Sequence, residues 1–114
     1  MVIQSANGRV VARDVRRADT FMTRLKGLMF QKQFPAEYDA LLITPCNAVH
    51  TMFMRYAIDV LFLDSELKVL HICHALRPWR LSQLIKGAAC VIESEAGSAK
   101  RCGIQVGDRL HFQE

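Results

Sequence analysis

The sequence predicts a mostly β domain: a small sandwich or barrel of short, mainly antiparallel strands, with one or two short helices packed against it. Apolar residue types make up 51% of the 114 residues and charged types 23%, so the chain can build a core. From residue 40 onward, short apolar runs alternate with turn-forming residues. The chain lacks the crossover helices that a parallel βαβ sheet needs. Its length fits a single domain, residues 1–114.

The N-terminal third predicts an edge strand, a short helix and a loop. Residues 9–15 have the pattern of a half-exposed edge strand. Asp19 and Thr20 can cap a helix, because short polar side chains accept hydrogen bonds from its first free amides. The helix that follows would carry an apolar stripe at helical spacing, formed by Phe21, Leu25, Leu28 and Met29. Residues 30–39, which include Pro35, are predicted to form a loop.

The rest of the chain predicts strands joined by tight turns. Residues 64–66 (DSE) are polar turn formers and would close a hairpin. A helical turn over residues 98–102 is expected to end at Gly103. Residues 77–80 are expected to form a loop. The predicted strands cover residues 40–44, 49–54, 58–63, 67–74, 88–93 and 109–112.

The run 58–63 is apolar on both of its faces, which predicts a strand covered on both sides. Asp59 is the charged residue within it, and a buried carboxylate needs a partner. Arg24 could pair with Asp59 or with Glu93 and tie the helix to the sheet. Arg24, Asp59 and Glu93 are therefore candidate site residues. Paired carboxylates can also perform acid–base chemistry, and both interpretations stay open.

The charge distribution does not predict nucleic-acid binding. The chain has 15 basic and 11 acidic side chains, a net charge of +4, and the excess lies in the first 38 residues. A basic segment can steer a protein to nucleic acid or to an anionic surface. Stacking on bases would need interleaved aromatic side chains, which are scarce there. We expect an ordinary solvated face.

The four cysteines form no C-x-x-C pair, which argues against a zinc knuckle or a thioredoxin-like motif. No secretory leader is visible, and no apolar run approaches the roughly 18 residues of a membrane span. We therefore expect a soluble, cytoplasmic protein with reduced thiols and no transmembrane segment.

Several motifs in a fixed order resemble a known family. The first is residues 24–29 (RLKGLM), the second is Cys46, His50 and Met54 at four-residue spacing, and the third is residues 58–64 (IDVLFLD). The C-terminal part adds Val91-Ile92-Glu93, Ala96-Gly97, Gly103-Ile104 and Gly107-Asp108. Over roughly residues 15–113 the chain resembles the prokaryotic family named domain of unknown function 192. The resemblance implies a small, mostly β domain with a short packed helix and no settled activity.

Two positions depart from the pattern of that family. Leu67 stands where the family often has glycine in the hairpin, and Ser94-Glu95 stands where Leu-Pro is common before Ala-Gly. Both departures concern local loop geometry. Many family members carry an export signal, which is not visible in this sequence.

Cys46, His50 and Met54 would share one face of an extended strand, because alternate residues point the same way. A thiol beside an imidazole can be activated as a nucleophile. Residues four apart in a strand lie about 13 Å apart, so contact between Cys46 and His50 would need a turn after Pro45. We interpret the three residues as the lining of a small pocket or groove. The alternative is a hydrolase or thiol enzyme with Cys46 as nucleophile and His50 as base.

Potential metal ligands are present, but at no compact spacing. Met52 and Met54 would add soft sulfur for Cu(I) if such a cluster existed. We expect no bound metal and no cofactor. The side chains considered are Cys46, His50, His71, Cys73 and His74.

The sequence predicts no reaction. We expect an accessory module that binds a small molecule or a protein, with the thiol enzyme as the alternative class. Trp79 is the single tryptophan and could either anchor a partner or cover the core.

Overall fold

The computed structural model describes residues 2–5, 8–20 and 28–113. The expectation of a mostly β domain is confirmed: strands follow one another along the chain, with one short helix among the described residues. The elements are β1 (Val2–Ser5), β2 (Val10–Ala12), β3 (Val15–Ala18), β4 (Ala40–Ile43), β5 (Ile58–Leu63), β6 (Val69–Leu76), β7 (Cys90–Glu95), α2 (Ser98–Arg101) and β8 (Leu110–Gln113).

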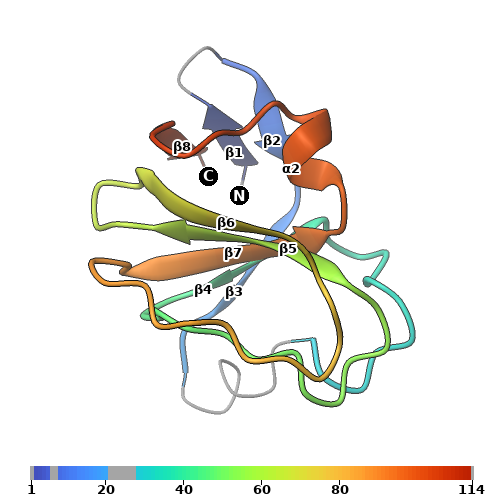
Figure 1. The fold of residues 1–114 in the computed structure, drawn as a ribbon. Coiled ribbons are helices and arrows are strands. Elements are labelled where there is room, and N and C mark those ends of the chain that lie inside the picture. The colour runs from blue at the N-terminus through green and yellow to red at the C-terminus, as the bar shows by residue number, and fades with distance from the viewer. Residues whose placement is uncertain (1, 6–7, 21–27, 114) are drawn as a thin grey trace.

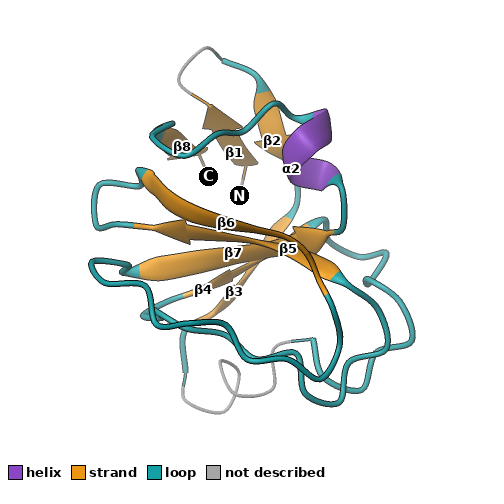
Figure 2. Ribbon diagram, in the orientation of Figure 1, coloured by secondary structure: helices purple, strands orange, loops and turns teal. Residues whose placement is uncertain are grey.

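The strands form two stacked sheets. A three-stranded sheet has the order β2-β1-β8, and a five-stranded sheet has the order β3-β4-β7-β5-β6. The smaller sheet and α2 lie over one face of the larger sheet. The loops 44–57 and 77–89, which we call the loop layer, cover its other face (Figures 1 and 2). Two apolar clusters fill the spaces between these layers, because each strand sends alternate side chains to opposite faces.

Strand β5 lies inside the larger sheet, between β7 and β6. All six of its residues are buried, as the sequence predicts. Leu61 and Leu63 pack between the two sheets, whereas Val60 and Phe62 pack under the loop layer. Both apolar clusters therefore depend on this strand.

The hairpin between β5 and β6 closes as predicted, and it explains the departure at Leu67. The Asp64 carboxylate accepts hydrogen bonds from the amides of Glu66 and Lys68, both at 2.9 Å. Leu67 adopts a φ of 66°, a left-handed conformation that costs a side-chain-bearing residue energy. A glycine would adopt this conformation without that cost. It would, however, lack the side chain with which Leu67 packs against the core between the sheets.

The predicted strand over residues 49–54 is wrong. These residues form a turn and pair with residues 79–82 through separate backbone hydrogen bonds and one bridge, between His50 and Leu81. Phe53 has a φ of 64°, which turns the chain away from an extended path. The apolar pattern that predicts a strand is instead the inner side of a loop layer, where Val49 and Met54 are buried.

The N-terminal third also differs from the expectation. The predicted edge strand 9–15 is two strands, β2 and β3, in different sheets. Strand β3 pairs with β4 in parallel, so the sheet is mixed, and the connection 19–39 supplies the crossover. The predicted helix falls largely on residues 21–27, outside the described residues, as does Arg24.

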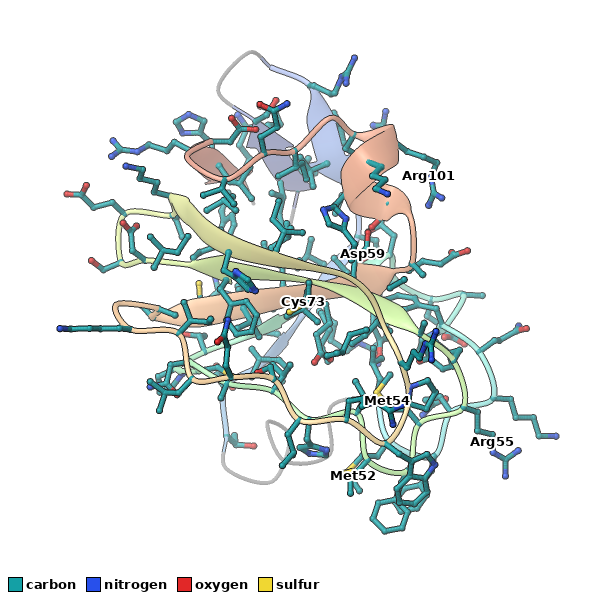
Figure 3. The ribbon with its side chains drawn as sticks, viewed as in Figure 1. Met52, Met54, Arg55, Asp59, Cys73 and Arg101 are labelled. Atoms are coloured by element: carbon teal, nitrogen blue, oxygen red, sulfur yellow. The ribbon has the colours of Figure 1, made fainter. Side chains whose placement is uncertain are left out.

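Asp59 is fully buried, and backbone amides are its partners. Its Oδ1 accepts a hydrogen bond from the Ala75 amide at 2.9 Å. Its Oδ2 accepts from the amides of Gly97 at 3.1 Å and Ala99 at 3.0 Å. Figure 3 shows Asp59 on β5, directed toward α2. The carboxylate therefore joins β5 to β6 and to the start of the helix.

We predict that Asp59→Asn lowers the free energy of unfolding by about 3 kcal/mol or more, because an amide nitrogen would face at least one of these amide donors. Urea unfolding would measure this. Asp108→Asn is the matched control, since Asp108 accepts one backbone bond, from Gln105, in an exposed turn. Equal, small losses in both variants would contradict a central role for Asp59.

Candidate binding site

A pocket of about 390 Å³ opens between the two sheets beside α2. Its walls come from β2, β4, β5 and β7, from the loop 34–39, and from the helix. The apolar lining includes Val11, Phe34, Leu61, Ile92 and Ile104. The polar lining includes Tyr38, Asp39, Ser94, Glu95, Ser98 and Arg101.

Three of these six polar side chains have hydrogen-bond partners within the protein. Both carboxylate oxygens of Asp39 accept backbone hydrogen bonds, from Arg13 at 2.9 Å and from Asp14 at 3.0 Å. The hydroxyls of Ser94 and Ser98 bond to each other at 2.5 Å. Those three side chains therefore stabilise the walls of the pocket.

Arg101 differs from Asp39, Ser94 and Ser98. It is exposed, and within residues 2–5, 8–20 and 28–113 its guanidinium makes no hydrogen bond or ion pair. A Cβ added to Gly97 would lie 3.0 Å from its Nη1, so the side chain folds back over the start of α2. Figure 3 shows Arg101 on the outer side of the helix, above β5 and β7. The guanidinium is thus available to an anion that enters the pocket.

Asp59 holds this wall in place. Helix α2 has only four residues, and its N-cap residue is Gly97, which offers no side-chain cap. A helix this short is not stable alone. The bonds from Gly97 and Ala99 to Asp59 supply the missing cap from the neighbouring strand. Asp59 thereby positions the helix that carries Ser98 and Arg101.

Glu93 lies behind the pocket, on the opposite face of β7. In the sheet register it stands between Leu41 of β4 and Val60 of β5, and it is only 3% exposed. Burial raises the pKa of its carboxyl to about 8, because the charged form loses its hydration. At neutral pH the carboxyl is therefore mostly protonated.

Two tyrosines from the neighbouring loops lie near Glu93. Burial raises the pKa of Tyr56, and the charges of Tyr38 and Glu93 raise it further. The Tyr56 hydroxyl is buried without a hydrogen-bond partner among the described residues. Phe34 contacts both tyrosine rings edge-on, with centroids 5.8 Å from Tyr38 and 6.4 Å from Tyr56. Tyr38 also lines the pocket, so this cluster borders it.

Cys46, His50 and Met54 do not line this pocket. Cys46 borders a shallow hollow with Pro45 and Ala89, and its thiol donates to the Ala48 carbonyl at 3.0 Å. The Nδ1 of His50 accepts a hydrogen bond from the Met52 amide at 3.2 Å. Met54 is buried in the core under the loop layer. Because residues 49–54 form no strand, these side chains do not share one strand face.

No group of three His, Cys, Asp or Glu side chains suited to a metal ion occurs in the part of the chain that the structure describes. His71 and Cys73 lie on β6, and burial raises the pKa of the Cys73 thiol. Within the same residues, no helix has the length and apolar character needed to cross a membrane.

Sequence reasoning identified Asp59 and Glu93 but missed Arg101, Ser94 and Ser98 as pocket residues. No pattern distinguishes Arg101 from Lys100 beside it, since its role depends on which side of a four-residue helix meets the pocket. The glycine before that helix was the available signal, because a helix start without a capping side chain needs a cap from elsewhere.

The model of the DUF192 family, described as "Uncharacterized ACR", matches residues 2–112. The chain belongs to this family. The resemblance inferred from its motifs is confirmed, and the family is uncharacterised.

Relatives agree with this assignment. A UPF0127 protein of Pyrococcus furiosus is 36% identical over 113 residues, covering 97% of both chains. Another from Pyrococcus horikoshii is 36% identical over 101 residues, covering 87% of both. The crystal structure of a Novosphingobium aromaticivorans protein of unknown function shares the fold, with a TM-score of 0.81 and 21% identity. That match covers 97% of this DUF192 chain and 82% of the other.

We predict that the free energy of unfolding of this DUF192 protein falls as the pH rises from about 4.5 to about 8, because Glu93 loses its proton over this range. The folded state raises the pKa of Glu93 from 4.5 to about 8, so it binds the proton more tightly than the unfolded state does. The stabilisation is complete below the unfolded pKa and disappears as the pH passes the folded one. The upper limit of the loss is about 5 kcal/mol, at about 1.4 kcal/mol per pH unit.

Urea unfolding across this pH range would measure the effect in Glu93→Gln and in Glu95→Gln, an exposed neighbour on the same strand. Glu93→Gln should flatten the profile, and Glu95→Gln should leave it unchanged. A wild-type profile that stays flat or rises over this window would contradict the assignment.

Proposed function

We propose that this chain is a ligand-binding accessory module that holds a small organic acid in the pocket between its sheets. The observation that carries the proposal is Arg101: an exposed guanidinium in the pocket lining, without an anionic partner among the described residues. Guanidinium groups bind carboxylates with two parallel hydrogen bonds, which favours this class of ligand.

The size and lining of the pocket support the proposal. Its volume of about 390 Å³ falls within the range of small-molecule sites, which combine apolar walls with a few polar groups. Val11 and Phe34, which are partly exposed, offer apolar surface to the body of the ligand. Glu95 shares the lining and would repel a second negative charge, so the proposed ligand carries a single carboxylate.

Two of the candidate residues support the pocket without contacting the proposed ligand. Asp59 fixes α2 and therefore Arg101, and Glu93 keeps a neutral carboxyl beside the tyrosines that border the pocket. A cytoplasmic location is part of the proposal, supported by Cys73, Cys90 and Cys102, whose thiols form no disulfide in the described part of the chain and so fit a reducing compartment. No observation supports the thiol-enzyme alternative: the Cys46 thiol donates to the Ala48 carbonyl, and the Nδ1 of His50 accepts from the Met52 amide.

We predict that benzoate or phenylacetate binds the protein more tightly than the corresponding uncharged amides. Arg101→Gln should weaken binding of the acids about tenfold, because it removes a charge-assisted pair, and should leave the amides unaffected. Isothermal titration calorimetry would measure both. Lys100→Gln is the matched control, since Lys100 is an exposed cation on the same helix outside the pocket lining.

If neither acid binds, or if the Arg101 and Lys100 variants bind the acids equally well, the proposal is wrong. Equal unfolding temperatures of the two variants would show that a loss of binding is not a loss of fold.

A further inference from the structure

Three exposed aromatic side chains form a row: Phe53 and Trp79 belong to the loops 44–57 and 77–89, and Phe30 contacts Phe53. Phe30, Phe53 and Trp79 are 64%, 47% and 52% exposed. The ring centroids of Phe30 and Phe53 lie 5.3 Å apart, and those of Phe53 and Trp79 lie 4.8 Å apart. Large apolar side chains grouped at a surface in this way mark an interaction site more often than scattered ones do. We call these three residues the aromatic row.

The backbone at the aromatic row is strained. All three residues adopt left-handed φ values: 67° at Phe30, 64° at Phe53 and 63° at Trp79. This conformation costs a bulky side chain about 1 kcal/mol or more. Because the three rings are exposed, their burial in the core offsets little of this strain. Backbone strain of this kind concentrates at functional sites.

A buried threonine fixes the turn that presents Trp79. Thr51 is fully buried, and its hydroxyl donates to the Arg77 carbonyl and accepts from the Arg80 amide at 2.9 Å. Its backbone amide donates to the Arg80 carbonyl at 2.8 Å, and its carbonyl accepts from the Trp79 amide at 2.9 Å. The amide of Phe30 also donates to the Phe53 carbonyl at 3.0 Å. These hydrogen bonds therefore fix the backbone beneath the aromatic row.

The loops 44–57 and 77–89 that carry Phe53 and Trp79 are cationic. They contain no acidic residue, and they contain four basic ones, all exposed: Arg55, Arg77, Arg80 and Lys86. The same loops expose Leu81 at 74% and Leu84 at 67%. Figure 1 shows both loops on the side of the large sheet away from the small sheet, and Figure 3 shows Arg55 extending outward from this layer.

We propose that the aromatic row and its two loops dock on the surface of an anionic lipid bilayer. The aromatic rings and the leucines would enter the boundary between headgroups and acyl chains, and the arginines would contact anionic headgroups. The proposal rests on a different face from the ligand pocket and does not depend on the proposed function.

This combination of side chains favours a bilayer over single-stranded nucleic acid. Bases need free aromatic faces for stacking, whereas the rings of the aromatic row already contact one another. Exposed leucines offer nothing to a base, but their transfer into an acyl environment lowers the free energy. The cationic rim matches the negative potential of anionic lipids.

The single tryptophan makes a direct test possible, because all tryptophan emission comes from Trp79. The wild-type protein would be titrated with vesicles of phosphatidylcholine alone and with vesicles of equal parts phosphatidylcholine and phosphatidylglycerol. We expect a blue shift and stronger emission with the anionic vesicles only, quenched by brominated acyl chains. Binding should weaken as the salt concentration rises, because the charges are exposed.

Variants separate the two contributions. Leu81→Ser with Leu84→Ser should weaken partitioning roughly tenfold. Arg77→Gln and Arg80→Gln should each weaken binding to anionic vesicles about fivefold. Val106→Ser is the matched control: Val106 is 61% exposed but lies outside both loops, and its variant should bind like the wild type. Equal thermal stability of all the variants would confirm that they fold.

Three results would overturn the proposal. The first is no shift of Trp79 emission with anionic vesicles. The second is equal loss in the leucine and Val106 variants. The third is quenching of Trp79 by a single-stranded oligonucleotide, or burial of Trp79 in a concentration-dependent dimer, without binding to vesicles.

Discussion

The buried carboxylate of Asp59 is the interaction on which the architecture of this protein depends. It lies inside the larger sheet with no exposure to water, and it receives backbone bonds from β6 and from both Gly97 and Ala99. A buried carboxylate without donors would cost several kcal/mol, so the site holds only while the donors stay in place. The helix start in turn lacks a cap of its own, so each group satisfies the other. The requirement is mutual, and it fixes α2 against the sheet.

From this contact the two faces of the larger sheet acquire different roles. On the face toward the small sheet, the fixed helix completes a pocket and places Arg101 in its lining. On the other face, the loop layer covers a second core and presents aromatic and basic side chains outward. Glu93 and Asp59 are both buried carboxyls in adjacent strands, yet their surroundings differ. Asp59 has three amide donors, whereas burial holds Glu93 in its neutral form.

The sequence predicts a strand well where its hydrophobic pattern alone decides the structure. Residues 58–63 are apolar on both faces and are followed by turn formers, and their limits agree with β5. The need of Asp59 for a partner was predictable from its apolar neighbours. The identity of that partner was not, because a backbone amide has no signature in the sequence, whereas an arginine such as Arg24 does.

Residues 49–54 show the opposite case. Their apolar pattern is that of a strand, but Thr51 binds the backbone of another loop and Phe53 turns the chain with a left-handed φ. Both effects depend on segments distant in sequence, so local pattern alone cannot reveal them. The exposure of Trp79 depends on the same loop framework, and for that reason the sequence left open whether it anchors a partner or covers the core.

Hydrogen exchange of the amides of Gly97 and Ala99, followed by NMR, tests the role of Asp59 most directly. If the carboxylate holds the helix start, both amides should exchange as slowly as those of Val60 and Ile92 in the core, which requires global unfolding. Exchange of the Gly97 and Ala99 amides that is as fast as that of exposed turns would show that α2 opens locally, and would contradict the account.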